Sequence, residues 1–479
     1  MPNPVLILHG WSDNADSFVG LKNWLVATGR PAEDVFLGDY ESMEDHVSFD
    51  DLADGLQTRL EDLARAGRVR LDPFSVDVIV HSTGGPVIRH WLRHHVTDFC
   101  GGDFGRCPLA RIIMLAPANF GSRLAAQGKS TLAKLFRGGL AHGFQTGRKI
   151  LEGLELGSPI LWQIAADDLF CGKAVYPAED RGPWVFIFSG THTYGELKGL
   201  VARGANEDGS DGTVRAAAAS LNSVRLQLDY TQPAHLLATA QRPVSAPMAF
   251  RLVEGINHSE IVPKDGTGQA PILPLLERCL AVRSRAEYET LRAQFDQDTA
   301  AFYQRQAERP LGDEQRVHAY QQFVVRVRDD MGNDVDDYRL DFHVVDEGIT
   351  HSTWQTTDDP VLRQLQRYQA FTQELQEKVI ADIQPHSVNR SYRTFFVNLD
   401  RLEDLQRRLP AGAFIGLNLD AAGPTPDLGY DTDTLRYIPV VSTLQDQNGH
   451  AVSFFARNSS TLVDFTVQRV PSENVFRFR

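Results

Sequence analysis

The chain of 479 residues lacks the features of several specialised protein classes. It has only four cysteines, too few to act as a disulfide framework in a chain of this length. Cys100 and Cys107 could pair across a short loop, but unpaired thiols are the simpler expectation. No Cys/His cluster has the spacing of a zinc site, and there is no internal repeat or low-complexity tract. With 42% hydrophobic and 23% charged residues, the composition is that of an ordinary globular protein.

A basic charge and long apolar runs are also missing. The net charge of −14 argues against nucleic-acid binding through a basic surface and against an overall attraction to anionic lipid headgroups. No segment approaches the roughly 20 apolar residues that span a bilayer. The apolar run at residues 4–8 is too short for a Sec-type signal peptide and has no basic flank. We expect a soluble or peripheral protein, whose membrane contact would be mainly apolar.

The first 280 residues alternate between strand and helix patterns. Short apolar runs predict buried strands at residues 4–8, 35–37, 76–80, 112–115 and 184–188. Helical spacing of apolar residues lies between them, most clearly at 49–63 and 86–96. Alternating strands and helices favour a parallel sheet covered on both faces. We therefore predict an α/β domain over residues 1–282.

The α/β pattern is interrupted by one long insertion, and a different pattern follows residue 282. Residues 121–183 form a long, glycine-rich insertion, which we interpret as a lid or cap. A polar helical connector is expected at 283–312. Residues 313–479 predict a β-rich, sandwich-like domain. Within that domain we expect a β-hairpin formed by 323–327 and 338–345, and a helix at 360–383.

The strongest chemical signal is the segment from Val80 to Gly85, VHSTGG, directly after a predicted strand and before a predicted helix. A nucleophile on such a tight turn needs small neighbours, and Gly84 and Gly85 meet that need. The usual G-x-S-x-G pattern has glycine where this chain has Val80, which is a departure. The alternative is that Ser82 only caps a helix.

Further motifs supply partners for Ser82. His9-Gly10 follows the first strand, so the backbone N–H groups of Trp11 and Thr83 could converge on an oxyanion. Asp211, in the motif SDGTV, stands where a catalytic acid is expected, with Asp208 as its competitor.

His258, in NHSEIV, is the expected base. The chain order Ser, Asp, His is that of the α/β-hydrolase fold. In this interpretation Ser82 attacks an acyl carbonyl, His258 transfers the proton and Asp211 orients the imidazole. His81 is expected to be structural, and the chemistry needs no metal or organic cofactor.

These motifs, together with the segment LAPANFGS at residues 115–122, resemble the lipase branch of the α/β-hydrolases. More narrowly, the HSTGG turn without a leading glycine and the β-rich C-terminal domain resemble the bacterial PlaB-type phospholipases A and lysophospholipases A. The family motif has threonine where this chain has Val80. Ser82, Asp211 and His258 match the family's Ser-Asp-His triad by motif.

The resemblance implies deacylation of phospholipids or lysophospholipids, peripheral association with the bacterial envelope and homo-oligomerisation, plausibly as a tetramer. Without that envelope association, a chain of this kind would be cytoplasmic. The alternatives are a triacylglycerol lipase, a general carboxylesterase, or a non-catalytic interaction protein on a hydrolase fold. We expect the C-terminal domain to serve membrane contact or self-association, because Phe476 and Phe478 alternate with arginines at its end.

Overall fold

The computed structural model divides the chain into two compact units. The first comprises Met1–Asn222 and Pro243–Val317, and the second comprises Ser223–Arg242 and His318–Arg479. The structure describes residues 2–11, 13–40, 43–95, 104–126, 147–176, 183–194, 207–231, 237–245, 247–264, 270–346, 366–431, 438–439, 443–446 and 448–475.

The first unit contains a six-stranded sheet in the order β2-β1-β3-β4-β5-β8, and every neighbouring pair in it is parallel. Its strands are β1 (Val5–Leu8), β2 (Val35–Gly38), β3 (Val76–His81), β4 (Leu109–Leu115), β5 (Trp184–Gly190) and β8 (Ala249–Val253). The strand order reverses between β1 and β3. Ligands of open α/β sheets bind beyond the carboxyl ends of the strands at such a reversal.

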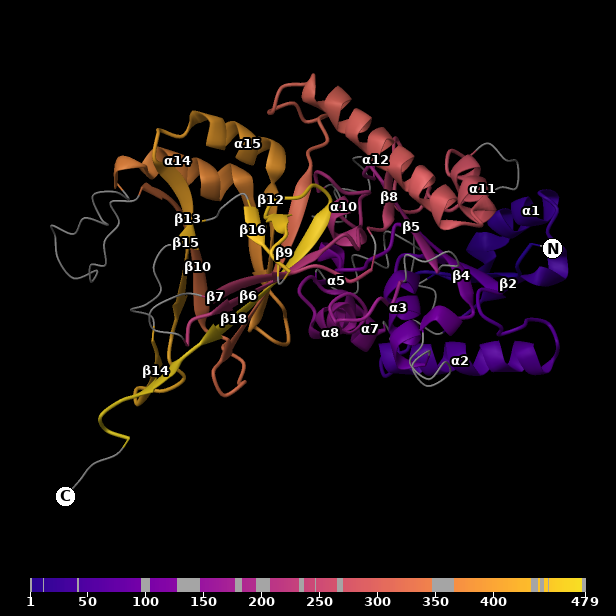
Figure 1. The fold of residues 1–479 in the computed structure, drawn as a ribbon, viewed down its shortest axis with the longest axis horizontal. Coiled ribbons are helices and arrows are strands. Elements are labelled where there is room, and N and C mark those ends of the chain that lie inside the picture. Colours follow the sequence, from indigo (N-terminus) through magenta and orange to yellow (C-terminus); the bar gives the residue numbers. More distant parts are fainter. Residues whose placement is uncertain are drawn as a thin grey trace. The chain divides into compact units, whose positions relative to one another are not determined.

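Helices cover both faces of this sheet, as Figure 1 shows: α11 and α12 lie on one side, and α2, α3 and α8 on the other. The helices of the unit are α1 (Val19–Ala27), α2 (Phe49–Arg65), α3 (Gly84–His94), α5 (Arg123–Ala126), α7 (Arg148–Leu154), α8 (Pro159–Asp168), α10 (Ala216–Ala219), α11 (Leu273–Ala281) and α12 (Arg285–Ala307), with short 3-10 turns at Ala15–Phe18, Ala32–Asp34 and Phe104–Arg106. The predicted α/β class is confirmed.

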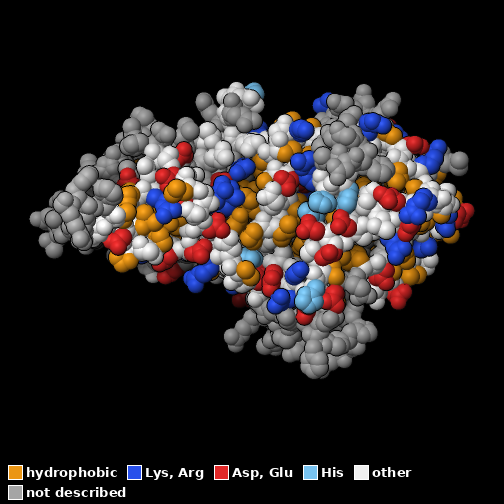
Figure 2. Space-filling model, turned by 90° about the horizontal axis from the view of Figure 1, so that it is seen from below, with side chains coloured by type: hydrophobic (Ala, Val, Ile, Leu, Met, Phe, Trp, Pro, Cys, Tyr) orange, Lys and Arg blue, Asp and Glu red, His pale blue; other side chains and the backbone are white. Residues whose placement is uncertain are grey.

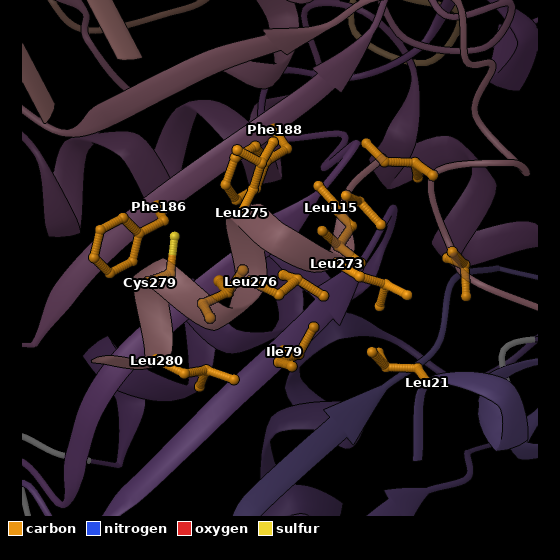
Figure 3. Close-up of a cluster of buried hydrophobic side chains, with 14 of the residues drawn as sticks. Leu21, Ile79, Leu115, Phe186, Phe188, Leu273, Leu275, Leu276, Cys279 and Leu280 are labelled. Atoms are coloured by element: carbon orange, nitrogen blue, oxygen red, sulfur yellow. The ribbon is translucent and has the colours of Figure 1, made fainter. Parts of the chain in front are cut away.

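Side chains from α11 fill the space above the middle of the sheet. In Figure 3, Leu276 and Leu280 of α11 lie beside Ile79 of β3, and Cys279 lies beside Phe186 of β5. All of these side chains are almost completely buried. This packing fixes β3, whose last residue precedes Ser82.

The helix α12 coincides with the expected connector, but it belongs to the core of the first unit. Ser284 caps its start by accepting a hydrogen bond from the backbone N–H of Glu287. The Tyr288 hydroxyl donates to the carbonyl of Val185 in β5 and accepts from the N–H of Ala249 in β8. The polar residues that suggested a connector therefore belong to the outer face of α12, while its inner face packs in the core.

The second unit consists mainly of two sheets. The larger has the order β11-β12-β9-β18-β6-β7, and the smaller has the order β10-β13-β15. Its elements are β6 (Val224–Asp229), β7 (Leu237–Gln241), β9 (Tyr320–Asp329), β10 (Tyr338–Asp346), α14 (Gln369–Glu374), a π-helical turn η4 (Leu375–Val379), β11 (Ile380–Pro385), β12 (Tyr392–Asn398), α15 (Leu399–Arg408), β13 (Ala413–Ala421), β14 (Leu428–Tyr430), β15 (Ile438–Pro439), β16 (Thr443–Gln445), β17 (Ala451–Ser453), β18 (Ser459–Val467) and β19 (Arg469–Pro471).

One buried cluster joins the two sheets of the second unit. Phe342 of β10 meets Phe395 of β12 edge to face at 5.3 Å, and Phe395 stacks on Phe323 of β9 at 5.1 Å. Side chains of the two sheets therefore share one core, which confirms the sandwich-like class. The segment Ser223–Arg242 belongs here rather than to the first unit because β6 pairs in parallel with β18.

Two local expectations for this region were wrong. β9 and β10 follow one another through a turn at Gly332, but they do not form a hairpin, since β9 pairs with β12 and β18 while β10 pairs with β13. The expected helix at 360–383 gives way at Ile380 to β11, which pairs with β12. In both cases pairing with distant strands overrides the local pattern.

Several expectations fall outside the described residues. These are Cys100 and its pairing, residues 127–146 and 177–182 of the expected lid, and Phe476 and Phe478 at the end of the chain. Among the helices that the structure describes, none is both long and apolar enough to cross a membrane.

Candidate active site

Ser82 occupies the sharp turn between β3 and α3. Its φ of 51° lies in the left-handed region, which non-glycine residues rarely adopt. Backbone hydrogen bonds hold the turn: Ser82 N–H donates to the carbonyl of Leu115, and the N–H groups of Gly85 and Ala118 donate to the carbonyl of Ser82. Backbone strain that is held in place in this way is typical of functional sites, and it presents the Ser82 side chain beyond the sheet edge.

Two glycines make room for this turn. A Cβ on Gly10 would lie 2.8 Å from the Cβ of Ser82, closer than real Cβ contacts come. A Cβ on Gly84 would lie 3.1 Å from the Cβ of Val80 and 3.3 Å from the carbonyl oxygens of Leu8 and His9. Gly84 thus accommodates the side chain of Val80, which explains how the turn forms without the leading glycine of the usual motif.

Ser82, His258 and Asp211 form a continuous hydrogen-bonded chain. The Nε2 of His258 lies 3.0 Å from the Oγ of Ser82, and its Nδ1 lies 2.9 Å from the Oδ2 of Asp211. The other carboxylate oxygen of Asp211 accepts from the N–H groups of Thr213 and Val214 at 3.0 and 2.8 Å. His258 and Asp211 are completely buried, so only Ser82 is partly open to a reactant.

Two hydrogen bonds join His258 to Asp211, whereas the backbone of the competing acid Asp208 bonds to Arg215. The carbonyl of Asp208 accepts from the Nε of Arg215, whereas the backbone N–H of His258 itself donates to the carbonyl of Asp211. Asp211 is therefore bound to His258 through both its side chain and its backbone. The geometry favours Asp211 over Asp208 as the orienting acid.

A small cavity opens in front of Ser82. Its walls include Trp11, Thr83 and Asp13 near the serine, and apolar side chains from α5 and α7, namely Ala125, Leu151 and Leu154. Its volume is about 40 Å³, which is room for only a few water molecules. The walls on α5 and α7 come from the segment expected to form a lid.

The two residues expected to supply oxyanion donors, Trp11 and Thr83, both line this cavity and contact each other. The N–H of Trp11 donates to the Oγ1 of Thr83 at 3.1 Å, and Thr83 is completely buried. The N–H of Thr83 donates to no group among the residues that the structure describes. No sequence motif indicates the contact with the Thr83 hydroxyl, because it depends on how two loops meet.

His81 lies directly behind the His258 ring. Its Nε2 donates to the carbonyl of His258 at 3.0 Å, and the two ring centroids are 4.8 Å apart. Burial, with the neighbouring His258 adding to it, lowers the pKa of His81 to about 4. His81 therefore stays neutral at ordinary pH and does not compete for the proton, in keeping with the structural role expected for it.

The parallel sheet with helices on both faces, and a serine on a strained strand-to-helix turn bonded to a histidine and an aspartate, define an α/β-hydrolase. Over its full length the chain is similar to the phospholipase PlaB from Legionella pneumophila. The two share 27% sequence identity with a TM-score of 0.78, and the match covers 100% of this chain and 96% of the phospholipase.

A second structure of that phospholipase, in complex with thio-NAD, matches with 26% identity and a TM-score of 0.77 over 99% of this chain and 96% of that one. No protein-family model and no curated protein sequence matches the chain. The expected resemblance to the PlaB-type phospholipases is confirmed, and the chain is an enzyme of the carboxylic-ester hydrolase class.

Proposed function

We propose that this chain is a phospholipase A and lysophospholipase A that uses Ser82, His258 and Asp211 as its catalytic triad. The observation that carries the chemistry is the unbroken hydrogen-bonded chain from Ser82 through His258 to Asp211. The choice of a phospholipid substrate is supported by the full-length similarity to the Legionella phospholipase.

The geometry matches each step of an acyl transfer. His258 Nε2 accepts the proton of the Ser82 hydroxyl as its Oγ attacks the ester carbonyl. Asp211 accepts from the Nδ1 side of the imidazole and stabilises its positive charge. The protonated His258 then donates to the leaving lysophospholipid or glycerophosphodiester oxygen, and a water molecule hydrolyses the acyl-enzyme by the same steps in reverse.

Stabilisation of the oxyanion is assigned to the backbone N–H groups of Trp11 and Thr83. The N–H of Trp11 is engaged with the Thr83 hydroxyl, so this hydroxyl must turn aside or donate its own proton to the oxyanion. Each such donor in a water-excluded site is worth about 3 kcal/mol of transition-state stabilisation.

An acyl chain needs more space than the cavity offers. Ala125, Leu151 and Leu154 provide apolar walls suited to a hydrocarbon chain, but about 40 Å³ holds only a few water molecules. We infer that α5 and α7 move apart when a lipid binds, as expected for a lid. Peripheral membrane contact and homo-oligomerisation, as a tetramer, belong to the same proposal.

The test compares the wild-type chain with Ser82→Ala on phospholipids, lysophospholipids, triglycerides and short p-nitrophenyl esters. We expect fatty-acid release from the two phospholipid classes and a loss of at least about 10³-fold in Ser82→Ala. Labelling by a fluorophosphonate should disappear in Ser82→Ala and persist in Ser75→Ala, a serine in the loop before β3. Preferred hydrolysis of triglycerides or short esters would favour a triacylglycerol lipase or a carboxylesterase instead.

A further inference from the structure

The outer edge of the α2–α3 pair carries a group of histidines that the proposed reaction does not use. The two helices pack against each other, and the indole Nε1 of Trp91 in α3 donates to the Oε1 of Gln57 in α2. Beyond this contact, three histidines at the end of α3 face two aspartates of α2: His90, His94 and His95, and Asp50 and Asp54. Figure 2 views the molecule from the side on which α2 runs in Figure 1, and it shows histidine side chains next to acidic ones.

Three of these side chains, Asp54, His94 and His95, are spaced closely enough to bind one metal ion. The Nε2 of His95 lies 2.8 Å from the Oδ1 of Asp54. One ligand atom from each of Asp54, His94 and His95 can be chosen so that all three lie within 4.8 Å of one another. Ligand atoms around a tetrahedral Zn²⁺ are about 3.3 Å apart, so small changes of rotamer would close the set around an ion.

The surroundings hold the imidazoles close to that arrangement. The rings of His94 and His95 meet edge to face at 5.0 Å, and the rings of His90 and His94 stack at 5.6 Å. The side chain of His95 is only 19% exposed, so it has little freedom to turn away. His90 is bound separately to Asp50 at 2.6 Å, which leaves His94 as the adaptable member.

The local field also favours a cation. His94 is the last residue of the 11-residue helix α3, and His95 is its C-cap. The carboxyl end of a helix carries partial negative charge from its unsatisfied carbonyl groups. Asp54 adds a full negative charge, and it is reachable from solvent because its side chain is 62% exposed.

We propose that Asp54, His94 and His95 bind one divalent transition-metal ion of the Zn²⁺ type, with water completing its coordination. Two imidazoles and one carboxylate suit Zn²⁺ and its neighbours, whereas Mg²⁺ and Ca²⁺ prefer oxygen ligands. The ion cross-links α2 to the end of α3 and is separate from the pocket of Ser82, which none of these three residues lines. This site would stabilise the first unit and takes no part in the acyl transfer.

The first experiment measures binding to the full chain without a histidine tag, after treatment with a chelator. Titration with Zn²⁺ should show one saturable site, and Zn²⁺ should raise the thermal midpoint of unfolding by a few degrees in a way that the chelator reverses. Absence of saturable binding at about 100 µM Zn²⁺, or an equal rise with Mg²⁺, overturns the proposal.

Variants then assign the ligands. His94→Ala and Asp54→Asn should each weaken Zn²⁺ binding at least tenfold, while His46→Ala, another exposed histidine of the same unit, should not change it. His95→Asn should weaken it to a similar degree. If partial burial of His95 makes that variant fold poorly, His94→Ala and Asp54→Asn still decide, because both side chains are exposed. Unchanged affinity in either His94→Ala or Asp54→Asn contradicts the site.

Discussion

Both units bury several aspartates, and one from each unit, Asp211 and Asp464, shows two different ways of balancing a buried carboxylate. Asp211 in the first unit is completely buried and accepts from two backbone N–H groups and from the imidazole of His258. Asp464 of β18 in the second unit is bound by permanent cations, Arg225 of β6 at 2.8 Å and Arg326 of β9 at 2.6 Å.

The identity of the partner therefore distinguishes Asp211, a carboxylate that can take part in a reaction, from Asp464, a carboxylate that holds strands together. His258 can take up and release a proton, and the charge on Asp211 stabilises the imidazolium each time it forms. Arginine stays charged at every accessible pH, so Asp464 and its two partners form a fixed link across three neighbouring strands. Burial and a short hydrogen bond are common to both, and only the chemistry of the partner distinguishes them.

The largest effect is expected from Asp211→Asn. An amide holds the imidazole in the wrong tautomer and cannot stabilise its charge, so kcat should fall by about 10⁴-fold. The measurement is release of fatty acid from a lysophospholipid, with thermal unfolding as the check that the fold is intact. Asp208→Asn serves as the control and should keep most of the activity. A loss in Asp208→Asn with activity retained in Asp211→Asn would transfer the role to Asp208.

The counterpart in the second unit is Asp464→Asn, which should act on stability. Burial by itself would raise the pKa of Asp464, but hydrogen bonds and charges from Arg326 and Arg225 outweigh it and hold that pKa below the ordinary value. A lowered folded-state pKa adds stability above about pH 4, and this is lost as the pH falls through the lowered value.

Removing the charge should cost about 2–4 kcal/mol in the free energy of unfolding, since two largely buried guanidinium groups lose their partner. Urea unfolding at pH 7 measures this. Asp420→Asn is the control, because Asp420 is 58% exposed and lies 3.9 Å from Arg339, and it should change stability by less than about 0.5 kcal/mol. Equal losses in both variants would contradict the assignment of a structural link.

The smallest effect is expected from His81, in the way the free energy of unfolding depends on pH below about 6.5. Its folded-state pKa of about 4 lies below the ordinary value near 6.5, so between these values the unfolded chain binds more protons than the folded one. Stability should therefore fall as the pH drops from about 6.5 towards 4. In His81→Asn this dependence should be shallower, as measured by urea unfolding at several pH values. A variant with the same slope as the wild type would show that His81 does not titrate in this way.

Local sequence patterns indicated the α/β class of the first unit and the three residues that hydrogen bonds join beside its sheet, but not the strand pairing of the second unit. Ser82, Asp211 and His258 follow strands or sit in short turn motifs, so their neighbours along the chain indicate their roles. The pairing of β6 with β18 and the separation of β9 from β10 depend on segments far apart in the sequence, which no local pattern encodes. The hydrogen bonds of Trp11 to Thr83 and of His81 to His258 were missed for the same reason, since loops from different strands create them.

The segment Ser223–Arg242 belongs to the second unit, but the ribosome makes it before residues 243–317 of the first unit. Arg225 of β6 and its partner Asp464 are 239 residues apart. At 5–20 residues per second, a ribosome would add Asp464 about ten to fifty seconds after Arg225. During that time the edge of β6 that later pairs with β18 remains unpaired. Such an edge can pair wrongly or be recognised by a chaperone. No single cut of the chain separates the units, so splitting it near residue 318 should leave the second unit without β6 and β7.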